Sequence, residues 1–558
     1  MPRTETQTGQ MTGGDILIQS LLANDVDHIF CVPGESYLAA LDSLHDVEEQ
    51  IKLVICRQEG GAAVMAEAHG KLTGKPGICF VTRGPGATNA SIGVHTAHQD
   101  STPMLLLVGD VARDQRDREA FQEVDFHRMF GALAKHVERC DDAGRLAEYV
   151  NRSLHIAQQG RPGPVVLTLP EDMLTDVVPQ SLPLRCRPAV TEPGSHALKE
   201  MIELLGRAEK PLALVGGGGW TPDGVQALRR FIEVQQLPVS AVFRRQDLIN
   251  NVDEMYVGDL GIAPNPDLAQ AVQDSDLLLV IGPRLGEMTS SGFSLFDIPG
   301  DGKRIIHIHP GADEIGRLYE PRLGIPANLN AFAGAAERLA PARSEGWPEW
   351  TASLRTSYEG WQAGGRCEGP VNLIKVVEHL RDTLPRDCII TNGAGNFASW
   401  VHRYHHYRSF PGQLAPTSGA MGYGLPAGIA AAITMPDRRV VTVAGDGDLM
   451  MSVQELATAA QYNARLIVLV FNNGMYGTIR MHQEREYPGR TSGTTLANPD
   501  FVALAQSFGG KGWLVTDTSD FAPALEEALA HDGLSLIEVQ ADPDAISPGT
   551  TLSALRKA

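Results

Sequence analysis

Short runs of apolar residues alternate with longer amphipathic stretches along most of this chain. The runs are mainly Val, Ile and Leu, without a polar residue at every second position. Strands that helices cover on both faces have this composition, whereas strands with one face in water alternate apolar and polar residues. The pattern therefore predicts the α/β class, with doubly wound parallel sheets. The expected buried strands are Lys52–Cys56, Gly77–Thr82, Met104–Val108, Val165–Leu169, Leu212–Val215, Leu277–Ile281, Arg304–His309, Cys388–Thr391, Val440–Ala444, Leu466–Phe471 and Ser535–Val539.

Two segments interrupt the alternation and are expected to be linkers. Pro179–Pro193 is rich in proline, and Ser344–Pro370 is polar with scattered Trp and Gly. They divide the 558 residues into three α/β domains, which we expect at 1–180, 194–343 and 370–558. Three domains agree with a usual size of about 150 residues.

Charge and cysteine content limit the classes of function. The chain carries 67 Asp and Glu against 47 Lys and Arg, a formal charge of −20, so nucleic acid and anionic membranes are not expected partners. No stretch approaches the roughly 20 apolar residues that a membrane span needs. The polar first residues predict no secretory signal. The seven cysteines form no CxxC pair, which favours a reducing compartment and a cytoplasmic protein.

Histidines occur in two groups. His307 and His309 share one face of an expected strand, where core or surface positions are more common than a metal pair. The run from His402 to His406 is expected to be a solvated helix or loop.

The strongest chemical signal is Gly445-Asp446-Gly447 after one apolar strand and Asn472-Asn473 after the next. The 24 residues between them suit one helical crossover, so both groups should leave the same sheet edge. Carboxylate and amide oxygens suit Mg²⁺, which keeps phosphate oxygens in its shell. The glycines and the following helix N-terminus suit a bound phosphate. Two ordinary turns after strands are the alternative.

This segment resembles the signature of the thiamine diphosphate-dependent enzymes. Further stretches carry the resemblance over nearly the whole chain, and it is strongest to the catalytic subunits of acetolactate synthases. The matching stretches are RQEGGAAVMAEAHGKLTGKPG, VTRGPGATNA, EAFQEVD and GAMGYGLPAGIAAA. The resemblance implies a pyrimidine-binding, a central and a diphosphate-binding domain, in that order.

The resemblance also implies cofactor ligands in the last domain. Mg²⁺ would be bound by the side chains of Asp446 and Asn473 and the backbone carbonyl of Met475. Met421 matches the apolar residue over which the cofactor bends. The remaining candidate cofactor-binding residues are Gly395, Asn396, Gly419, Gly445, Gly447 and Asp448. Related enzymes more often carry Gln-His where this chain has Asn396-Phe397.

Glu59 is the principal catalytic candidate. It follows an expected strand and opens a helix, and the resemblance places its carboxyl group against N1′ of the aminopyrimidine, where it would exchange the proton that leads to cofactor activation. Stabilisation of a helix N-terminus by an acidic residue is the alternative. Family architecture combines Glu59 of one chain with the Mg²⁺ site of another, which implies at least a homodimer.

Several positions bear on the substrate. Pyruvate-type decarboxylases carry an acidic residue where this chain has Ile479; an apolar side chain offers no proton, which favours joining to a second carbonyl compound. Phe121 and Gln122 match a pair that lines the active site of acetolactate synthases, with Gln122 as a catalytic candidate. Core packing for Phe121 and a surface position for Gln122 are the alternative.

Other positions depart from acetolactate synthases. Met288 and His482 stand where the family has an Arg and a Trp of the acceptor pocket, although nearby Arg480 offers a cation. Glu35 replaces a Gly and is a candidate second acid or base, while Arg83 replaces a small residue and is a candidate for binding a substrate carboxylate. Surface charge is the alternative for both.

The predicted function is decarboxylation of a pyruvate-like 2-oxo acid by thiamine diphosphate and Mg²⁺, followed by carboligation. A 2-oxo acid decarboxylase or carbon–carbon lyase of the same family is the alternative. Acetolactate synthases hold FAD in the central domain, so Gly216–Gly219 is a candidate FAD site, although it matches the dinucleotide fingerprint poorly. The substrates are expected to be small 2-oxo acids or aldehydes, and the sequence does not indicate a regulatory subunit.

Overall fold

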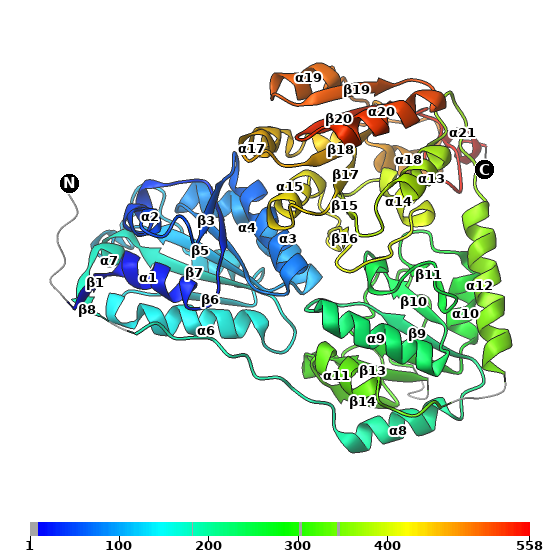
Figure 1. Cartoon of the computed structure of the whole chain (residues 1–558), viewed down its shortest axis with the longest axis horizontal. Helices are drawn as coiled ribbons and strands as arrows, with labels where there is room; N and C mark the ends of the chain where they lie inside the picture. Colours follow the sequence, from blue (N-terminus) through cyan, green and yellow to red (C-terminus); the bar gives the residue numbers. More distant parts are fainter. Residues whose placement is uncertain (1–8, 181, 301–303, 343–345, 558) are drawn as a thin grey trace. The chain divides into compact units, whose positions relative to one another are not determined.

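The computed structural model describes residues 9–180, 182–300, 304–342 and 346–557. It contains two compact units, Met1–Ala189 and Val190–Ala558. The first unit holds one six-stranded parallel sheet and the second holds two, each flanked by helices (Figure 1). The predicted class, three doubly wound parallel sheets, is thereby confirmed. In the described residues, no helix has the length and apolar composition needed to cross a membrane.

The first unit is built on the sheet β3-β2-β4-β5-β7-β6. Residues on alternate strand positions pack with α1, α2 and α6 in one core, whereas α3 and α4 contact each other and strands of the same sheet. A short antiparallel pair, β1–β8, joins the two ends of the unit. The elements are β1 (Gln10–Thr12), α1 (Gly13–Leu22), β2 (His28–Cys31), η1 (Glu35–Tyr37), α2 (Leu38–His45), β3 (Lys52–Ile55), α3 (Glu59–Thr73), β4 (Gly77–Val81), α4 (Gly84–Asp100), β5 (Met104–Asp110), η2 (Arg113–Gln115), α5 (Phe126–Phe130), β6 (His136–Arg139), η3 (Ala143–Arg145), α6 (Leu146–Gln158), β7 (Pro164–Pro170), α7 (Glu171–Thr175) and β8 (Val177–Pro179).

The first sheet of the second unit has the order β11-β10-β9-β12-β13-β14. Its strands are fully buried except at the edges, as their continuous apolar sequences predict. The elements are α8 (Ser195–Leu205), β9 (Pro211–Val215), α9 (Pro222–Gln235), β10 (Val239–Val242), η4 (Gln246–Leu248), β11 (Tyr256–Leu260), α10 (Pro266–Asp274), β12 (Leu277–Ile281), β13 (Ile305–His309), η5 (Ala312–Glu314), β14 (Leu323–Pro326), α11 (Leu329–Ala336) and α12 (Trp347–Ala363).

The second sheet of this unit has the order β16-β15-β17-β18-β20-β19. β15, β17 and β18 are parallel neighbours in this sheet, so the ends of these strands meet at one edge. The elements are α13 (Leu373–Thr383), β15 (Ile389–Asn392), α14 (Phe397–Tyr404), β16 (Gln413–Leu414), α15 (Gly424–Thr434), β17 (Val440–Gly445), α16 (Asp446–Leu449), η6 (Val453–Glu455), α17 (Leu456–Gln461), β18 (Leu466–Asn472), α18 (Gly477–Glu486), α19 (Phe501–Ser507), β19 (Lys511–Val515), α20 (Thr518–Ala530), β20 (Ser535–Gln540) and α21 (Leu552–Leu555).

One expected linker is largely helical. Residues 182–193 have no regular structure, but the interpretation of Ser344–Pro370 as a connector is wrong because α12 occupies most of it. Trp347 and Tyr358 of this helix are buried in the core of the first sheet of the unit, and the Trp347 Nε1–H donates to the Ala208 carbonyl oxygen at 2.8 Å. The apolar stripe of α12 is narrow, so the polar surroundings concealed it. The domain limits 1–180, 194–343 and 370–558 stay predictions.

The histidine run is not solvated, which corrects a second expectation. His402 lies in α14 and His405 directly after it, and burial lowers the pKa of each to about 3. Arg403 stacks on the Trp361 ring of α12, with 3.6 Å from its Cζ to the ring centroid. This run therefore packs against α12. His307 and His309 are buried in β13, and the ring of each contacts a backbone carbonyl, as expected for core histidines.

Candidate active site

The carboxyl ends of β17 and β18 bring the predicted metal ligands to one sheet edge. The register pairs Gly445 with Phe471, so Asp446 and Asn473 follow neighbouring strand ends. The Asn498 Nδ2 group donates to Asp446 Oδ2 at 2.7 Å and to Asn472 Oδ1 at 2.9 Å. Asn498 thus connects the two strand ends, although the sequence reasoning did not single it out.

Asp446 is a buried acid. Asp446 is 2% exposed, and burial raises the pKa of its carboxyl group. In the described part of the chain we find no ion pair at this carboxylate. The Asn473 Oδ1 atom accepts a hydrogen bond from the Met475 N–H at 3.2 Å, and Met475 itself pairs with Thr495. These oxygen donors fit a hard divalent cation, which would offset the cost of burying the charge.

Asp448 organises two loops instead of facing an open metal position. Its Oδ1 atom accepts hydrogen bonds from the N–H groups of Ala394 at 3.0 Å and Gly422 at 2.9 Å. A Cβ atom on Gly393 would lie 2.1 Å from the same oxygen, so this close approach requires glycine. Burial raises the pKa of Asp448 to about 7. Asp448 therefore holds together the loops after β15 and before α15, and its role toward the cofactor stays a prediction.

The glycines of the motif accommodate aromatic rings. A Cβ atom on Gly395 would lie 2.7 Å, and one on Gly445 2.9 Å, from the ring of Phe397. Gly447 has the same relation to the Tyr476 ring, at 2.7 Å. These three glycines therefore allow tight packing behind the loops, whether or not their backbones approach a phosphate.

The loop before α15 holds two more predicted cofactor contacts. Gly419 has a φ of +69°, and a Cβ atom there would meet no atom within 4 Å, so this position borders open space. Met421 is 37% exposed, which leaves part of its side chain available to a ligand. Asn396 is held between neighbours, because its Oδ1 accepts from the Thr478 hydroxyl at 2.9 Å and its Nδ2 lies 3.4 Å from Met481 Sδ.

Glu59 is the first residue of α3 in the first unit, after the carboxyl end of β3. The Asn89 Nδ2 group donates to its Oε2 atom at 2.9 Å. A Cβ atom on Gly86 would lie 3.4 Å from the other carboxyl oxygen, Oε1. The carboxyl group is therefore held on one side by an amide of α4 and bordered on the other by a glycine of the same helix.

Arg83 and Glu35 form an ion pair. The Arg83 guanidinium donates to Glu35 Oε1 at 2.8 Å and to Glu171 Oε2 at 3.0 Å, and its side chain is 8% exposed. Two carboxylates thus already neutralise Arg83, so a substrate carboxylate would have to displace one of them. Glu35 is likewise ion-paired instead of being an isolated acid. The expected roles of both residues toward substrate stay predictions.

Phe121 and Gln122 lie in the loop that follows η2. The Gln122 carbonyl accepts from the Gly84 N–H at 3.0 Å, and Gln122 has a φ of +64°. Phe121 is 73% exposed in the single chain, which contradicts a core position for its ring. The loop is thereby attached to the start of α4, the helix that carries Asn89.

The candidate substrate residues of the second unit are on α18 and in the loop after β12. Ile479 is 54% and Met288 36% exposed, so both offer apolar surface. The His482 Nδ1 atom lies 2.6 Å from the Arg485 guanidinium. Arg480 donates to the hydroxyls of Thr494 and Thr495. These bonds already occupy the Arg480 guanidinium, which argues against a role for it as a cation for the substrate.

Models of known protein families match a segment in each of the three sheet regions. Residues 11–129 match the N-terminal TPP binding domain of thiamine pyrophosphate enzymes, 198–335 their central domain and 393–539 their C-terminal TPP binding domain. The chain belongs to the thiamine pyrophosphate enzymes. Thiamine pyrophosphate and thiamine diphosphate are the same compound, so the family resemblance read from the motifs is confirmed.

Individual relatives of this thiamine pyrophosphate enzyme match it from end to end. The acetolactate synthase large subunit of Parasynechococcus marenigrum is 32% identical over 95% of this chain and 87% of its own. The acetolactate synthase isozyme 2 large subunit of Escherichia coli is 30% identical over 95% and 96%. The acetolactate synthase of Bacillus subtilis is 29% identical over 95% and 93%.

Three residues that support the enzyme's candidate site were missed in the sequence. Asn89 and Asn498 bond the predicted catalytic and metal-binding carboxylates. Arg244, after β10, is buried with a φ of +61°; it donates to the carbonyl oxygens of Pro416 and, at 3.0 Å, of Gly393. No local signal marks these residues, because each acts on a segment more than 25 positions away.

The glycine run of the central domain also has a structural explanation. Gly217 has a φ of +78°, and a Cβ atom on it would lie 2.3 Å from the Gly282 carbonyl oxygen. A Cβ on Gly216 would lie 2.3 Å from the Val242 side chain. These glycines allow the ends of β9, β10 and β12 to approach closely, so they are not by themselves evidence for a nucleotide.

Proposed function

We propose that this enzyme decarboxylates pyruvate or a close 2-oxo acid and joins the remaining fragment to a second carbonyl compound, as an acetolactate synthase does. The observation that carries the proposal is the full-length similarity to acetolactate synthases. Ile479 agrees with it, because an exposed apolar side chain on α18 offers no proton that would end the reaction as simple decarboxylation.

Separate residues of the chain would bind the cofactor and orient the catalytic carboxyl group. Thiamine diphosphate, when bound, supplies the carbon nucleophile and holds the electron pair left by CO₂. Asp446 and Asn473, with the carbonyl of Met475, would hold the Mg²⁺ ion that anchors its diphosphate. Asn89 fixes the Oε2 atom of Glu59 and so orients the carboxyl group for proton exchange at Oε1.

We further propose that Glu59 of one chain and Asp446 of a second complete each active site. The two residues belong to different compact units, and the family resemblance assigns them to different subunits. Because two relatives are named as large subunits, association with a smaller kind of chain is part of this proposal. Sedimentation of the purified protein tests it: a monomer with full activity would contradict the shared site.

A specific observation favours the second candidate, a decarboxylase or lyase of the same family. Met288 cannot form the bidentate bonds by which an Arg holds the carboxylate of a 2-oxo acid acceptor. Arg83 is already paired with Glu35 and Glu171. An acceptor without a carboxylate, such as an aldehyde, would need neither cation.

The test supplies thiamine diphosphate, Mg²⁺ and single 2-oxo acids, with or without aldehydes, and identifies products by NMR. Acetolactate from pyruvate supports the first proposal; free aldehyde or an aldehyde-derived ketol supports the second. Glu59→Gln should bind the cofactor and lose most turnover, whereas Glu48→Gln, an exposed acid of the same unit, serves as the matched control. Wild-type turnover by the Glu59 variant would refute its assignment.

FAD in the central domain stays a prediction, supported by the likeness to acetolactate synthases. Visible absorption of the protein as purified tests it. A spectrum without flavin bands, unchanged after incubation with FAD and gel filtration, would contradict it.

A further inference from the structure

Three metal-ligating side chains meet in the first unit at the sheet edge opposite Glu59. Asp27 and His28 stand at the start of β2, whereas Glu59 follows the end of β3. His69 lies on α3, ten residues after Glu59, which is about 15 Å along the helix. The group is therefore separate from the predicted catalytic residues, although it shares a helix with one of them.

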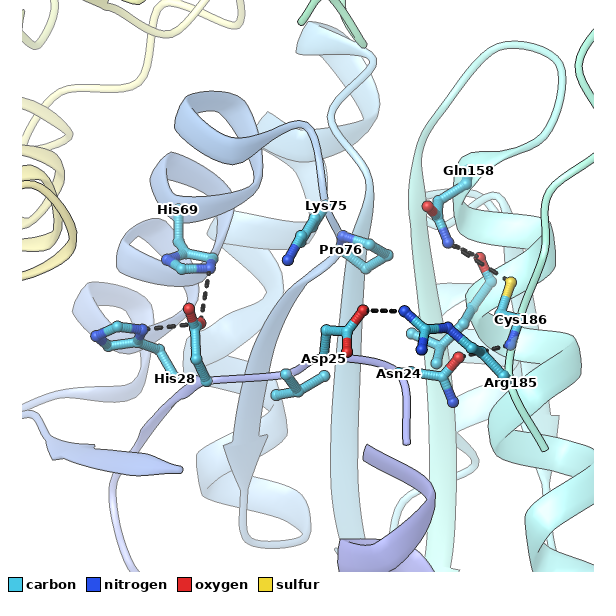
Figure 2. A pocket seen from close by; sticks show the side chains of 12 residues that line it. Asn24, Asp25, His28, His69, Lys75, Pro76, Gln158, Arg185 and Cys186 are labelled. Atoms are coloured by element: carbon cyan, nitrogen blue, oxygen red, sulfur yellow. Dashed lines mark hydrogen bonds and ion pairs between the residues drawn. The ribbon is translucent and has the colours of Figure 1, made fainter. Parts of the chain in front are cut away.

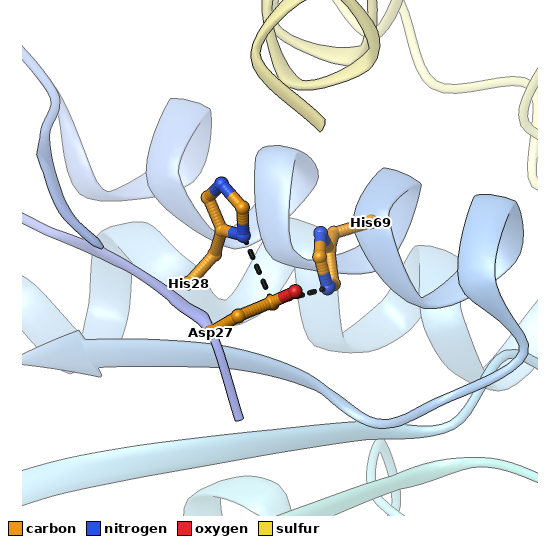
Figure 3. A group of neighbouring side chains, drawn as sticks. All are labelled: Asp27, His28 and His69. Carbon is orange, nitrogen blue, oxygen red and sulfur yellow. Dashed lines mark hydrogen bonds and ion pairs between the residues drawn. The ribbon is translucent and has the colours of Figure 1, made fainter. Parts of the chain in front are cut away.

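The ligand atoms of this group already lie close together. Asp27 Oδ1 is 2.9 Å from His28 Nδ1 and 3.6 Å from His69 Nε2, and all three atoms lie within 4.8 Å of one another. Figure 3 shows both imidazoles turned toward the Asp27 carboxylate from different elements. Ligands about 2.1 Å from a tetrahedral zinc ion are separated by roughly 3.4 Å, so small side-chain rotations suffice.

The side-chain chemistry of the group suits a metal. The side chain of His69 is 5% exposed and that of Asp27 is 61% exposed, so the group lies at the border between the interior and solvent. Two imidazoles and one carboxylate form a donor set that zinc binds in many proteins.

A cavity of about 150 Å³ adjoins the group and includes all three residues in its lining. Figure 2 shows Lys75 and the Asp25–Arg185 ion pair on the same cavity. Arg185 balances the negative charge of Asp25. The Lys75 ammonium disfavours a metal cation in the cavity, whereas the Asp27 carboxylate favours one. The space leaves room for a water molecule as a further ligand.

We propose that Asp27, His28 and His69 bind one divalent transition-metal ion of the zinc class, with a remaining coordination position open to the cavity. Imidazole nitrogen favours zinc, cobalt and nickel over Mg²⁺. The ion would join the first residues of β2 to α3, the helix that begins with Glu59. This site is distinct from the Mg²⁺ position at Asp446.

The experiment uses the full-length protein saturated with thiamine diphosphate and Mg²⁺, so that the diphosphate position is occupied. Zn²⁺ is titrated in competition with a chromophoric chelator, and Co²⁺ absorption reports nitrogen ligation. Asp27→Asn is the main variant because the Asp27 side chain is 61% exposed, so the change should not affect folding. His28→Gln is the second. His136→Gln is the matched control, since His136 Nε2 lies 2.8 Å from Glu138 Oε1 in a pair for which the described residues offer no third ligand.

We expect one Zn²⁺ site per wild-type chain that each of the two variants weakens at least about tenfold, since loss even of a residue behind a metal ligand costs that much. The control should keep wild-type affinity. Equal Zn²⁺ binding by wild type and Asp27→Asn would overturn the proposal, as would equal weakening by His136→Gln. A wild-type chain without a Zn²⁺ site would also overturn it.

Discussion

Replacing Asp448 with Ala should loosen two loops of the candidate active site at once. The substitution removes the acceptor of the Ala394 and Gly422 N–H groups. A buried donor left without a partner costs about 1–3 kcal/mol. Gly422 is buried and Ala394 partly so, which gives a combined local loss of about 2–4 kcal/mol. Asp448→Asn should lose far less, because its amide oxygen still accepts both bonds.

Hydrogen exchange measured by mass spectrometry is the suitable assay, because it reports local opening in a protein that need not unfold in two states. In Asp448→Ala, peptides covering residues 393–397 and 419–424 should exchange roughly thirtyfold faster or more, since about 1.4 kcal/mol corresponds to tenfold. The core strand β20 serves as an internal control. At pH 6, below the pKa of about 7, the wild-type side chain is largely neutral, so Asn is its close mimic. Equal protection in Asp448→Ala and wild type, or equal loss in both variants, would refute the reasoning.

Three further predictions test separate parts of the structure. Asn89→Ala removes the bond to Glu59 and should lower kcat about fivefold, equivalent to about 1 kcal/mol, in steady-state kinetics; unchanged kcat would contradict the orienting role. Gly445→Ala should destabilise the protein by about 1–3 kcal/mol because its Cβ meets the Phe397 ring, and Phe397→Leu should recover part of the loss in melting temperature. Burial raises the pKa of Asp259 to about 7, so the folded chain keeps a proton that the unfolded chain releases near pH 4, and the free energy of unfolding should fall by up to about 4 kcal/mol as the pH rises from 4 to 7. Asp259→Asn should flatten that slope in melting curves, and an unchanged slope would show that other groups cause it.

The strands that the sequence predicted are those with continuous apolar composition. All eleven expected runs lie on strands of the three sheets, with ends shifted by at most two residues. Most missed strands are sheet edges, such as β6, β14 and β19, where polar and apolar residues mix because one side of the strand is open. The other misses, β2 and β10, have only four residues each.

The candidate site was predictable where the chemistry is local in sequence. The GDG and NN segments end neighbouring strands, so the edge at which Asp446 and Asn473 meet follows from βαβ topology. The inward turn of Asp448 was not predictable, because it depends on loops that lie 26 and more residues away. Arg83 was interpreted as a substrate ligand because its partners, Glu35 and Glu171, lie 48 and 88 residues away in the chain.

Arg244 gives the central domain a thermodynamic connection to the cofactor loops. Its guanidinium comes from the end of β10, but it bonds carbonyl oxygens of the loops that contain Gly393 and Pro416. A change that shifts Arg244 must therefore change the free energy of the arrangement that those loops adopt. Linkage is reciprocal, so a ligand that orders the loops should also stabilise the end of β10. The central sheet would then influence the affinity for the cofactor without contacting it.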